Sequence, residues 1–243
     1  FNMENEMKIQ LPSIVFSAKS MDFISSCDLK DHKSIWNVTA GKIIGVKKEI
    51  RQHYLRYQKN LCAYCRTEVL HDHGLYWDIE HIIPKDKYAI FLFEPRNLTL
   101  SCRHCNSKKS NKEVFNRRVY KTKGYPFKIR DYPVGGDFFS IIHPHYDKYS
   151  NHIEMYIYES RIIYEPKSDK GRNTYAMCNL ERFVHIAIND TGDQDIIDFI
   201  GESLLNMDDG DLFEHSPREK KLMDIILGIK SRIEKKYLNR DFA

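Results

Sequence analysis

Apolar residues recur at helical spacing between about residues 34 and 60. The members of this stripe lie three or four positions apart and are Val46, Ile50, Tyr54, Tyr57 and Leu61. Such spacing places them on one face of a helix. The pattern predicts one amphipathic helix over 34–60 that leads directly into Cys62. The preceding residues 1–33 show little periodicity, and we expect irregular structure there with a short strand over 14–16.

The next segments favour strands. Residues 76–83 are rich in aromatic and β-branched side chains and are stopped by Pro84, which predicts a strand. A second strand is expected over 97–101. Residues 106–115 are polar and rich in lysine, and we expect a short helix there. A strand–strand–helix unit of this size buries little core, so a bound metal would have to supply part of its stability.

The second half of the chain has a different pattern, with a turn-rich connector followed by a hairpin and helices. Glycine and proline punctuate residues 116–137, which predicts a connector with turns. Strands over 153–159 and 162–165, separated by a turn near Ser160, predict a hairpin. Helical patterns follow over 173–188, 194–207 and 217–237. The last begins with Ser216 as N-cap and Pro217 at the first helical position.

These patterns predict an α+β protein, with a small metal-clasped core inside a mostly helical chain that ends in a hairpin and helices. We expect an N-terminal segment and helix (1–60), a core (61–116), a basic connector (117–137) and a C-terminal region (138–243) able to dock a partner. The apolar runs are too short to cross a bilayer. The first twenty residues lack the basic head and apolar stretch of a secretory signal. We therefore expect a cytoplasmic protein with no membrane contact.

Charge is distributed unevenly along the chain. The net charge of +4 is modest. Between Asn106 and Arg130 the one acid is Glu113, against nine basic residues: Lys108, Lys109, Lys112, Arg117, Arg118, Lys121, Lys123, Lys128 and Arg130. Between Arg182 and Arg218 there are many acids and no lysine or arginine. The basic stretch could neutralise phosphates, although most such runs are solvated faces.

Four of the six cysteines form two CxxC pairs, Cys62 with Cys65 and Cys102 with Cys105. Each pair can present two thiolates from one tight turn, and two pairs complete a tetrahedral zinc site. The alternative is disulfides or coincidence, which a reducing compartment disfavours. Because protein thiolates would fill every position, such a zinc ion is structural. The lone Cys27 and Cys178 are read as small buried hydrophobic residues.

The residues between and after the pairs carry candidate chemistry. They are Asp78-Ile79-Glu80-His81-Ile82-Ile83-Pro84-Lys85, then Asn97-Leu98-Thr99-Leu100, and then Cys102-Arg103-His104-Cys105-Asn106-Ser107-Lys108-Lys109. In order, spacing and cysteine frame, residues 61–115 resemble the HNH, or ββα-metal, nuclease family. More narrowly, they resemble the HNH components found with retrons and with ATPase-containing antiphage systems such as Septu. Outside this segment the resemblance is looser.

The resemblance implies a role for each motif residue. His81 would be the general base, and Glu80 and Asn106 would hold a catalytic metal. Asn97 would brace the loop and orient the histidine, and Lys109 would contact a phosphate. The chemistry agrees, because histidine can act as a base near neutral pH and a divalent cation can stabilise developing oxyanions.

The chain departs from the commonest family pattern at two of these positions. Glu80 stands where aspartate is usual, and Asn106 stands where a second histidine often lies. Both offer oxygen ligands, which favours Mg²⁺ or Mn²⁺ over a histidine-rich zinc site. Adjacent strand residues face opposite ways, so Glu80 and His81 can serve one site only if the strand twists or ends there. Asp78 shares the face of Glu80 and is the alternative ligand.

The remaining candidates are assigned more simply. The residues predicted to contact phosphate without reading bases are Lys108, Lys109, Lys112, Arg117 and Arg118. We expect His104 to face solvent or nucleic acid. His143, His145 and His152 could form a second metal cluster, but packed connector residues are the preferred interpretation.

These expectations combine into a metal-dependent endonuclease acting on DNA, with structural Zn²⁺ and catalytic Mg²⁺ or Mn²⁺. By resemblance, it would be the effector of a bacterial defence system with a partner ATPase. The same constellation can hydrolyse RNA, so an RNA- or tRNA-cleaving enzyme is one alternative. A non-catalytic zinc module that binds nucleic acid or protein is the other, although such a module needs no base and oxygen ligands inside its clasp.

Overall fold

The computed structural model describes residues 11–68, 76–123, 130–158 and 161–183. The helices expected over 194–207 and 217–237, and the end of that expected over 173–188, lie outside these residues. The chain divides into two compact units, Phe1–Tyr149 and Ser150–Ala243. The first unit contains all the motif residues named above.

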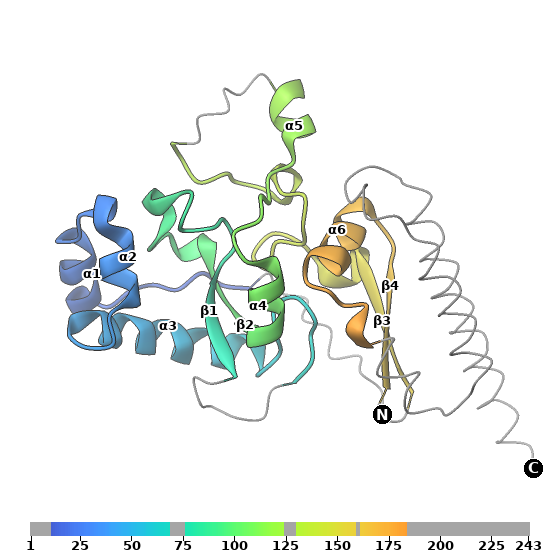
Figure 1. Ribbon diagram of the computed structural model, residues 1–243, viewed down its shortest axis with the longest axis horizontal. Helices are drawn as coiled ribbons and strands as arrows, with labels where there is room; N and C mark the ends of the chain where they lie inside the picture. Colours follow the sequence, from blue (N-terminus) through green and yellow to red (C-terminus); the bar gives the residue numbers. More distant parts are fainter. Residues whose placement is uncertain (1–10, 69–75, 124–129, 159–160, 184–243) are drawn as a thin grey trace, which may run out of the picture. The chain divides into compact units, whose positions relative to one another are not determined.

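The first unit begins with three helices, α1 (Ala18–Ser25), α2 (His32–Asn37) and α3 (Lys42–Gln58), with a 3₁₀ turn over Leu29–Asp31 (Figure 1). The prediction of one helix over 34–60 was wrong because the chain breaks between α2 and α3. Val38 is extended and Gly41 has a φ of 82°, which a glycine adopts without strain. The short strand expected over 14–16 is also absent, and that segment is irregular.

The apolar stripe of α3 is buried, and the helix ends in a polar contact with the sheet. Ile43, Val46, Ile50 and Tyr54 are all buried. Gln58 in the last turn is 1% exposed, and its side chain both accepts from the amide of Leu100 and donates to its carbonyl. These bonds satisfy backbone groups at the sheet edge that would otherwise be buried without partners. The helix therefore fixes the sheet as well as covering it.

The two predicted core strands are present as β1 (Trp77–His81) and β2 (Leu98–Cys102), paired antiparallel with Glu80 opposite Thr99. Helix α4 (Arg103–Lys109) follows β2 directly and packs on both strands (Figure 1). It begins three residues earlier than predicted because the Cys102 side chain accepts the amide of Cys105 as an N-cap. It ends at Lys109, since Ser110 has a φ of 50°.

The predicted connector contains a helix that the sequence pattern did not reveal. Helix α5 (Arg117–Thr122) is capped by the Asn116 side chain. Tyr120 from this helix contacts the ring of Phe115, which in turn packs on Phe139. The connector is thus anchored to the first unit through aromatic contacts.

The second unit begins with the hairpin that the sequence predicted. Strand β3 (Ile153–Tyr158) pairs antiparallel with β4 (Arg161–Pro166), and helix α6 (Asp169–Met177) packs on β4. Helix α6 begins before the predicted Asn173 because Ser168 caps it. A Cβ at Gly171 would overlap the carbonyl oxygen of His152, so α6 approaches the chain here as closely as only glycine allows.

The described residues combine helices with two small sheets, which confirms the α+β class. None of their helices has both the length and the apolar character needed to span a bilayer.

Candidate functional site

The four motif cysteines converge in the first unit. Their sulfur atoms all lie within 4.8 Å of one another, and no other group of three or more His, Cys, Asp or Glu side chains among the described residues comes together in this way. Cys62 and Cys65 come from the turn after α3, whereas Cys102 and Cys105 come from the β2–α4 junction. The cluster therefore ties the end of the long N-terminal helix to the ββα core.

The sulfur geometry fits a tetrahedral ion. The Sγ atoms of Cys65 and Cys102 are 3.8 Å apart. Zinc with Zn–S bonds of about 2.3 Å separates neighbouring sulfurs by about 3.8 Å. Each cysteine pair also forms a tight turn: Arg66 has a φ of 56° in the first, and the amide of Cys105 points at the Cys102 sulfur in the second. A structural zinc site accounts for this arrangement.

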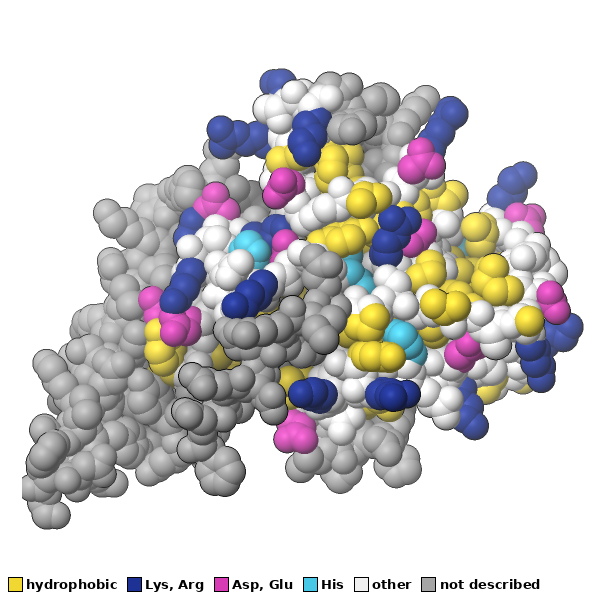
Figure 2. All heavy atoms as spheres, turned by 180° about the vertical axis from the view of Figure 1, so that it is seen from behind, with side chains coloured by type: hydrophobic (Ala, Val, Ile, Leu, Met, Phe, Trp, Pro, Cys, Tyr) yellow, Lys and Arg dark blue, Asp and Glu magenta, His cyan; other side chains and the backbone are white. Residues whose placement is uncertain are grey.

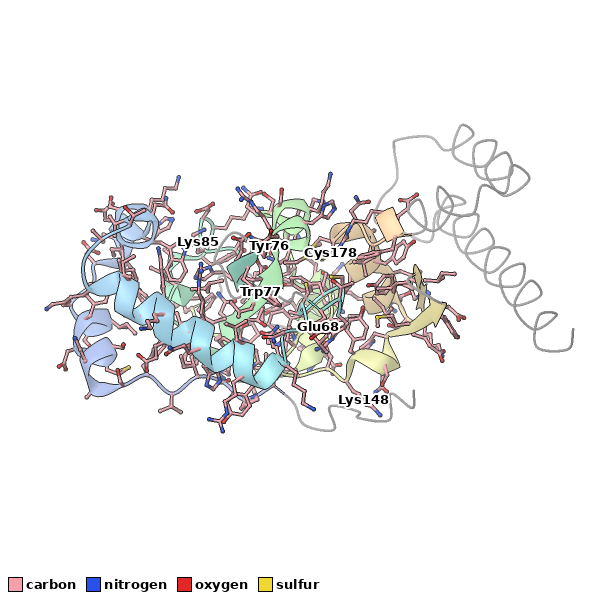
Figure 3. All side chains as sticks on the ribbon, turned by 90° about the horizontal axis from the view of Figure 1, so that it is seen from below. Glu68, Tyr76, Trp77, Lys85, Lys148 and Cys178 are labelled. Atoms are coloured by element: carbon pink, nitrogen blue, oxygen red, sulfur yellow. The ribbon has the colours of Figure 1, made fainter. Side chains whose placement is uncertain are left out.

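A pocket of about 450 Å³ lies beside this cluster, on the side where β1 ends. It is lined by His81, Glu80 and Asn106, together with Asp78. The structure thus brings three of the four predicted catalytic residues to one cavity. Lys85 also lines it and is labelled in Figure 3, where it lies on the side of the core nearest the blue N-terminal helices.

His81 is buried and held as a neutral imidazole. Its Nε2 lies 3.1 Å from the carbonyl oxygen of Leu92, so the proton is on Nε2 and Nδ1 carries the lone pair. The ring packs edge-on against Trp36 of α2, with 4.5 Å between ring centroids. Burial, with a smaller contribution from Lys85, lowers the pKa of His81 to about 3. The imidazole is therefore neutral at pH 7, but with a pKa this low it is a weaker base than an ordinary histidine; an anion bound beside it would raise its basicity.

Glu80 points to the other side of the strand, toward α4. The Lys109 ammonium lies 2.5 Å from its Oε1, and the hydroxyl of Tyr64 donates to the same oxygen at 3.0 Å. Burial raises the pKa of Glu80, and the Lys109 charge opposes that rise. Because both contacts fall on Oε1, Oε2 is the oxygen left for a ligand in the pocket. Glu80 and His81 point to opposite faces of β1. Because the strand ends at His81, both residues can still line the same cavity.

Asp78 and Asn106 form a second pair between β1 and α4. The Asn106 amide nitrogen donates to Asp78 Oδ2 at 2.8 Å. A carboxylate accepts only from the NH₂ end of an amide, so this bond fixes which way the Asn106 side chain is turned. Its Oδ1 is then the atom offered to a cation. Asp78, the alternative ligand in the sequence, therefore orients Asn106 in the structure.

Asn97 is fully buried and braces the loop that follows β1. Its Oδ1 accepts from the amide of Ile83 at 2.7 Å, and its Nδ2 donates to the carbonyls of Ile83 and Phe91 at 3.1 Å each. This loop also carries Leu92, whose carbonyl holds His81. Asn97 thus acts on the histidine through the backbone it organises, with no direct bond between the two side chains.

His143 and His145, further along the chain, also help to hold the segments around the site in place. The His143 Nε2 lies 2.8 Å from the hydroxyl of Tyr132, which lies 3.3 Å from Asn97 Oδ1. His145 is held between the carbonyls of Leu11 and Leu98, each 2.8 Å from a ring nitrogen. Both histidines are buried with partners of their own, which agrees with the structural interpretation.

His152 has a different local partner. Its Nδ1 lies 2.8 Å from the hydroxyl of Ser168, the N-cap of α6. This contact links the start of the hairpin to the start of the helix within the second unit.

The predicted phosphate contacts separate into two groups. Lys108, Lys112, Arg117 and Arg118 are exposed. Lys109 is fully buried, donates to the carbonyl of His81 at 3.0 Å and pairs with Glu80. The expectation that Lys109 contacts a phosphate conflicts with this geometry, because its ammonium is committed to the core. His104 is exposed, as expected.

Other pocket residues were absent from the predicted site. Lys47 and Arg51 of α3 line it, as does Trp36 of α2. The sequence contained a signal for the two cations: each directly follows a member of the buried stripe, Val46 or Ile50, and they are four residues apart. That spacing puts them side by side along the edge of the buried face.

Two comparisons with known proteins give matches. Residues 62–112 match the family model for HNH endonuclease. The chain is 29% identical over 154 residues to the Septu protein PtuB of Bacillus thuringiensis, a match that covers 63% of this chain and 46% of the relative. The matched region thus spans about half the length of that curated relative. No solved structure matches the chain significantly.

The matched segment begins at Cys62 and includes both cysteine pairs, Glu80, His81, Asn97 and Asn106. Residues 62–112 therefore form an HNH endonuclease domain, in a chain similar to the Septu protein PtuB.

Proposed function

We propose that the chain is a metal-dependent endonuclease that hydrolyses phosphodiester bonds of DNA, with His81 as the general base. The observation that carries this proposal is the single pocket lined by His81, Glu80 and Asn106. A base and two oxygen ligands around one cavity are what hydrolysis of a phosphodiester requires. A purely structural zinc module has no use for them.

Each residue of the pocket has a distinct chemical role. His81, neutral and held through Nε2, accepts a proton from the attacking water at Nδ1. Glu80 Oε2 and Asn106 Oδ1 are oxygen donors suited to Mg²⁺ or Mn²⁺. Bound there, such an ion would supply positive charge against the oxyanions of the transition state. Lys109 and Tyr64 hold Glu80, and Asp78 holds Asn106, so the two oxygen donors are oriented before any ligand arrives.

The exposed residues Lys108, Lys112, Arg117 and Arg118 supply further phosphate contacts. We also infer that the enzyme is the effector of an antiphage defence system and works with a partner ATPase. The similarity to the Septu protein PtuB supports this role.

The proposal is tested on purified, zinc-replete protein with plasmid DNA and with RNA, in Mg²⁺ or Mn²⁺ and then in EDTA. We expect metal-dependent nicking or linearisation of DNA. His81→Ala should reduce the rate roughly a hundredfold or more. His104→Ala is the matched control, because His104 is exposed on α4 and does not line the pocket.

Cleavage that survives in His81→Ala would show that the base is wrong. Cleavage of RNA alone would change the substrate assignment. If the wild type cuts neither, the assay is repeated with a candidate partner ATPase. Cleavage that then depends on the ATPase supports the effector role, and continued silence favours a non-catalytic zinc module.

A further inference from the structure

Three cations converge on the catalytic pocket from outside the predicted basic stretch. Lys47 and Arg51 come from α3, and Lys85 comes from the loop after β1. The exposed members of the predicted phosphate-contact set do not line this pocket. On the face shown in Figure 2, lysine and arginine side chains lie singly or in small groups among acidic ones. Where a cation lies is therefore a better guide to phosphate binding in the pocket than how many cations the surface carries.

Two of these cations have no direct ion pair with an acid of the pocket. Glu80 is paired with Lys109, and Asp78 accepts from Asn106. Asp86 lies 4.0 Å from Lys85 and 3.7 Å from His32. Within the described part of the chain, neither Lys47 nor Arg51 forms an ion pair with an acid.

Arg51 has a buried hydrogen-bond donor that is not satisfied within the described residues. Its Nε is buried and has no hydrogen-bond partner among the described residues. A buried donor of this kind is costly to leave unsatisfied. Lys47, in contrast, already donates to the carbonyl oxygens of Trp36 and Val38. Of the two α3 cations, Arg51 is therefore the one without a hydrogen bond or ion pair to a described residue, and its half-buried side chain lines the pocket.

The like charges also act on one another. The pKa of Lys47 is lowered, first by burial and then by the charges of Arg51 and Lys85. The three like charges repel one another in this partly enclosed cavity; Asp86 beside Lys85 and Asp78 offset part of that repulsion, and a bound anion would offset more. A phosphodiester beside His81 would supply that anion, and the planar guanidinium of Arg51 can grip two of its oxygens.

We propose that Lys47, Arg51 and Lys85 form a phosphate-binding wall of the catalytic pocket, which holds the nucleic-acid backbone against His81. The proposal rests on the endonuclease function above and extends it, because it assigns substrate binding to α3. The exposed basic residues of α4 and α5 then contact phosphates outside the cavity.

The test measures binding without cleavage. Fluorescence anisotropy follows a labelled DNA duplex, and separately a labelled RNA, without added Mg²⁺ or Mn²⁺ and over a range of salt. Arg51→Gln is compared with Arg56→Gln, which removes an exposed cation from the same helix. We expect Arg51→Gln to weaken binding about tenfold near 0.1 M salt and to reduce the slope of log K against log salt by about 0.9. Arg56→Gln should change affinity less than about twofold.

Two controls keep the result interpretable. Zinc content and melting temperature are measured for every variant. Lys85→Gln provides a second, independent removal from the loop, where the side chain is 25% exposed and substitution disturbs less packing. Lys85→Gln should also reduce the slope of log K against log salt. Lys47 is left intact because its bonds to Trp36 and Val38 support α2.

The outcomes separate this inference from the proposed function. If Arg51→Gln and Lys85→Gln bind as tightly as the wild type, the wall is wrong, while loss of cleavage in His81→Ala would still support the nuclease. An equal loss in Arg51→Gln and Arg56→Gln would also overturn the wall, because it would reflect overall charge. A wild type that binds neither DNA nor RNA would defeat both proposals.

Discussion

The described residues form two antiparallel two-stranded sheets that differ in what covers them. The β1–β2 sheet is covered by α4 and by α3, and its strands are almost entirely buried. The β3–β4 sheet packs on α6, and Glu154 and Glu165 on its strands stay partly exposed. The same local element is therefore used once as the floor of a site and once as an ordinary hairpin.

The difference shows where chemistry can be built. Glu80, His81, Thr99 and Ser101 are polar and buried in β1–β2, and burial of such groups is tolerated only with partners. Lys109 of α4 pairs with Glu80, Gln58 of α3 accepts from Thr99, and the Leu92 carbonyl holds His81, whereas the Ser101 hydroxyl has no hydrogen-bond partner among the described residues. In β3–β4 the pair of Lys167 with Glu154 lies near the surface, where solvent weakens it. We expect substitutions in the two sheets to have unequal effects.

The largest effect should come from the cysteine cluster. Structural zinc contributes on the order of 10 kcal/mol to the folding of small clasped modules. We expect Cys105→Ser to lose its zinc and its cooperative unfolding transition. The two tryptophans, Trp36 and Trp77, are both buried in the first unit, so their fluorescence reports this loss directly.

Cys27→Ser is the matched control, since Cys27 lies outside the cluster. It should keep both zinc and the transition. A zinc-replete Cys105→Ser protein with an unchanged transition would show that the cluster does not stabilise the fold.

The buried ion pair should show the next largest effect. Lys109→Met leaves Glu80 buried without its partner, which should cost about 3–5 kcal/mol of unfolding free energy. The exposed pair offers the comparison: Lys167→Met should cost less than about 1 kcal/mol. Urea unfolding followed by circular dichroism measures both.

Adding Glu80→Gln to Lys109→Met should recover part of the loss, because the unpaired charge is then gone. Equal costs for Lys109→Met and Lys167→Met would contradict the distinction between the two sheets.

A substitution at Gly171 tests the packing of the second sheet, and one at Gly45 in α3 serves as its comparison. Gly171→Ala forces a methyl group into the His152 carbonyl and should destabilise the hairpin–α6 contact by about 1–3 kcal/mol. Gly45→Ala in α3 meets open space and should stabilise the helix by up to about 1 kcal/mol. Hydrogen exchange over residues 153–166 should rise in Gly171→Ala alone. Unchanged exchange there would mean that the close approach is not required.

The smallest effect is a pH dependence centred on β2. Burial lowers the pKa of His145, whose ring bonds the Leu98 carbonyl at the start of that strand. Because the unfolded chain binds the proton more readily, stability is present above the ordinary value of about 6.5 and declines as pH falls below it. His145→Gln should reduce this decline between pH 7 and 5 without abolishing it, because His81, whose pKa burial lowers to about 3, contributes over the same range. An unchanged slope of stability against pH would remove His145 as a cause.

Much of the site was predictable from sequence because its elements are local. The CxxC pairs lie in short turns that can hold one metal, and aromatic and β-branched residues located β1, although the strand ends at His81 and not at Ile83. The single helix over 34–60 was mispredicted because periodicity does not reveal a break at Val38 and Gly41. Helix α5 was missed because half of its residues are charged and its packing depends on Phe115.

The sequence by itself determined the class of the core and the inventory of metal-binding and candidate catalytic residues, because spacing alone brings thiolates, carboxylate, imidazole and amide into one small unit. Only the tertiary structure decided how they act together. It paired Lys109 with Glu80, turned Asn106 by means of Asp78, and brought Arg51 to the pocket. These contacts join residues up to dozens of positions apart, and only the packing of α3 and α4 around the sheet brings such residues together.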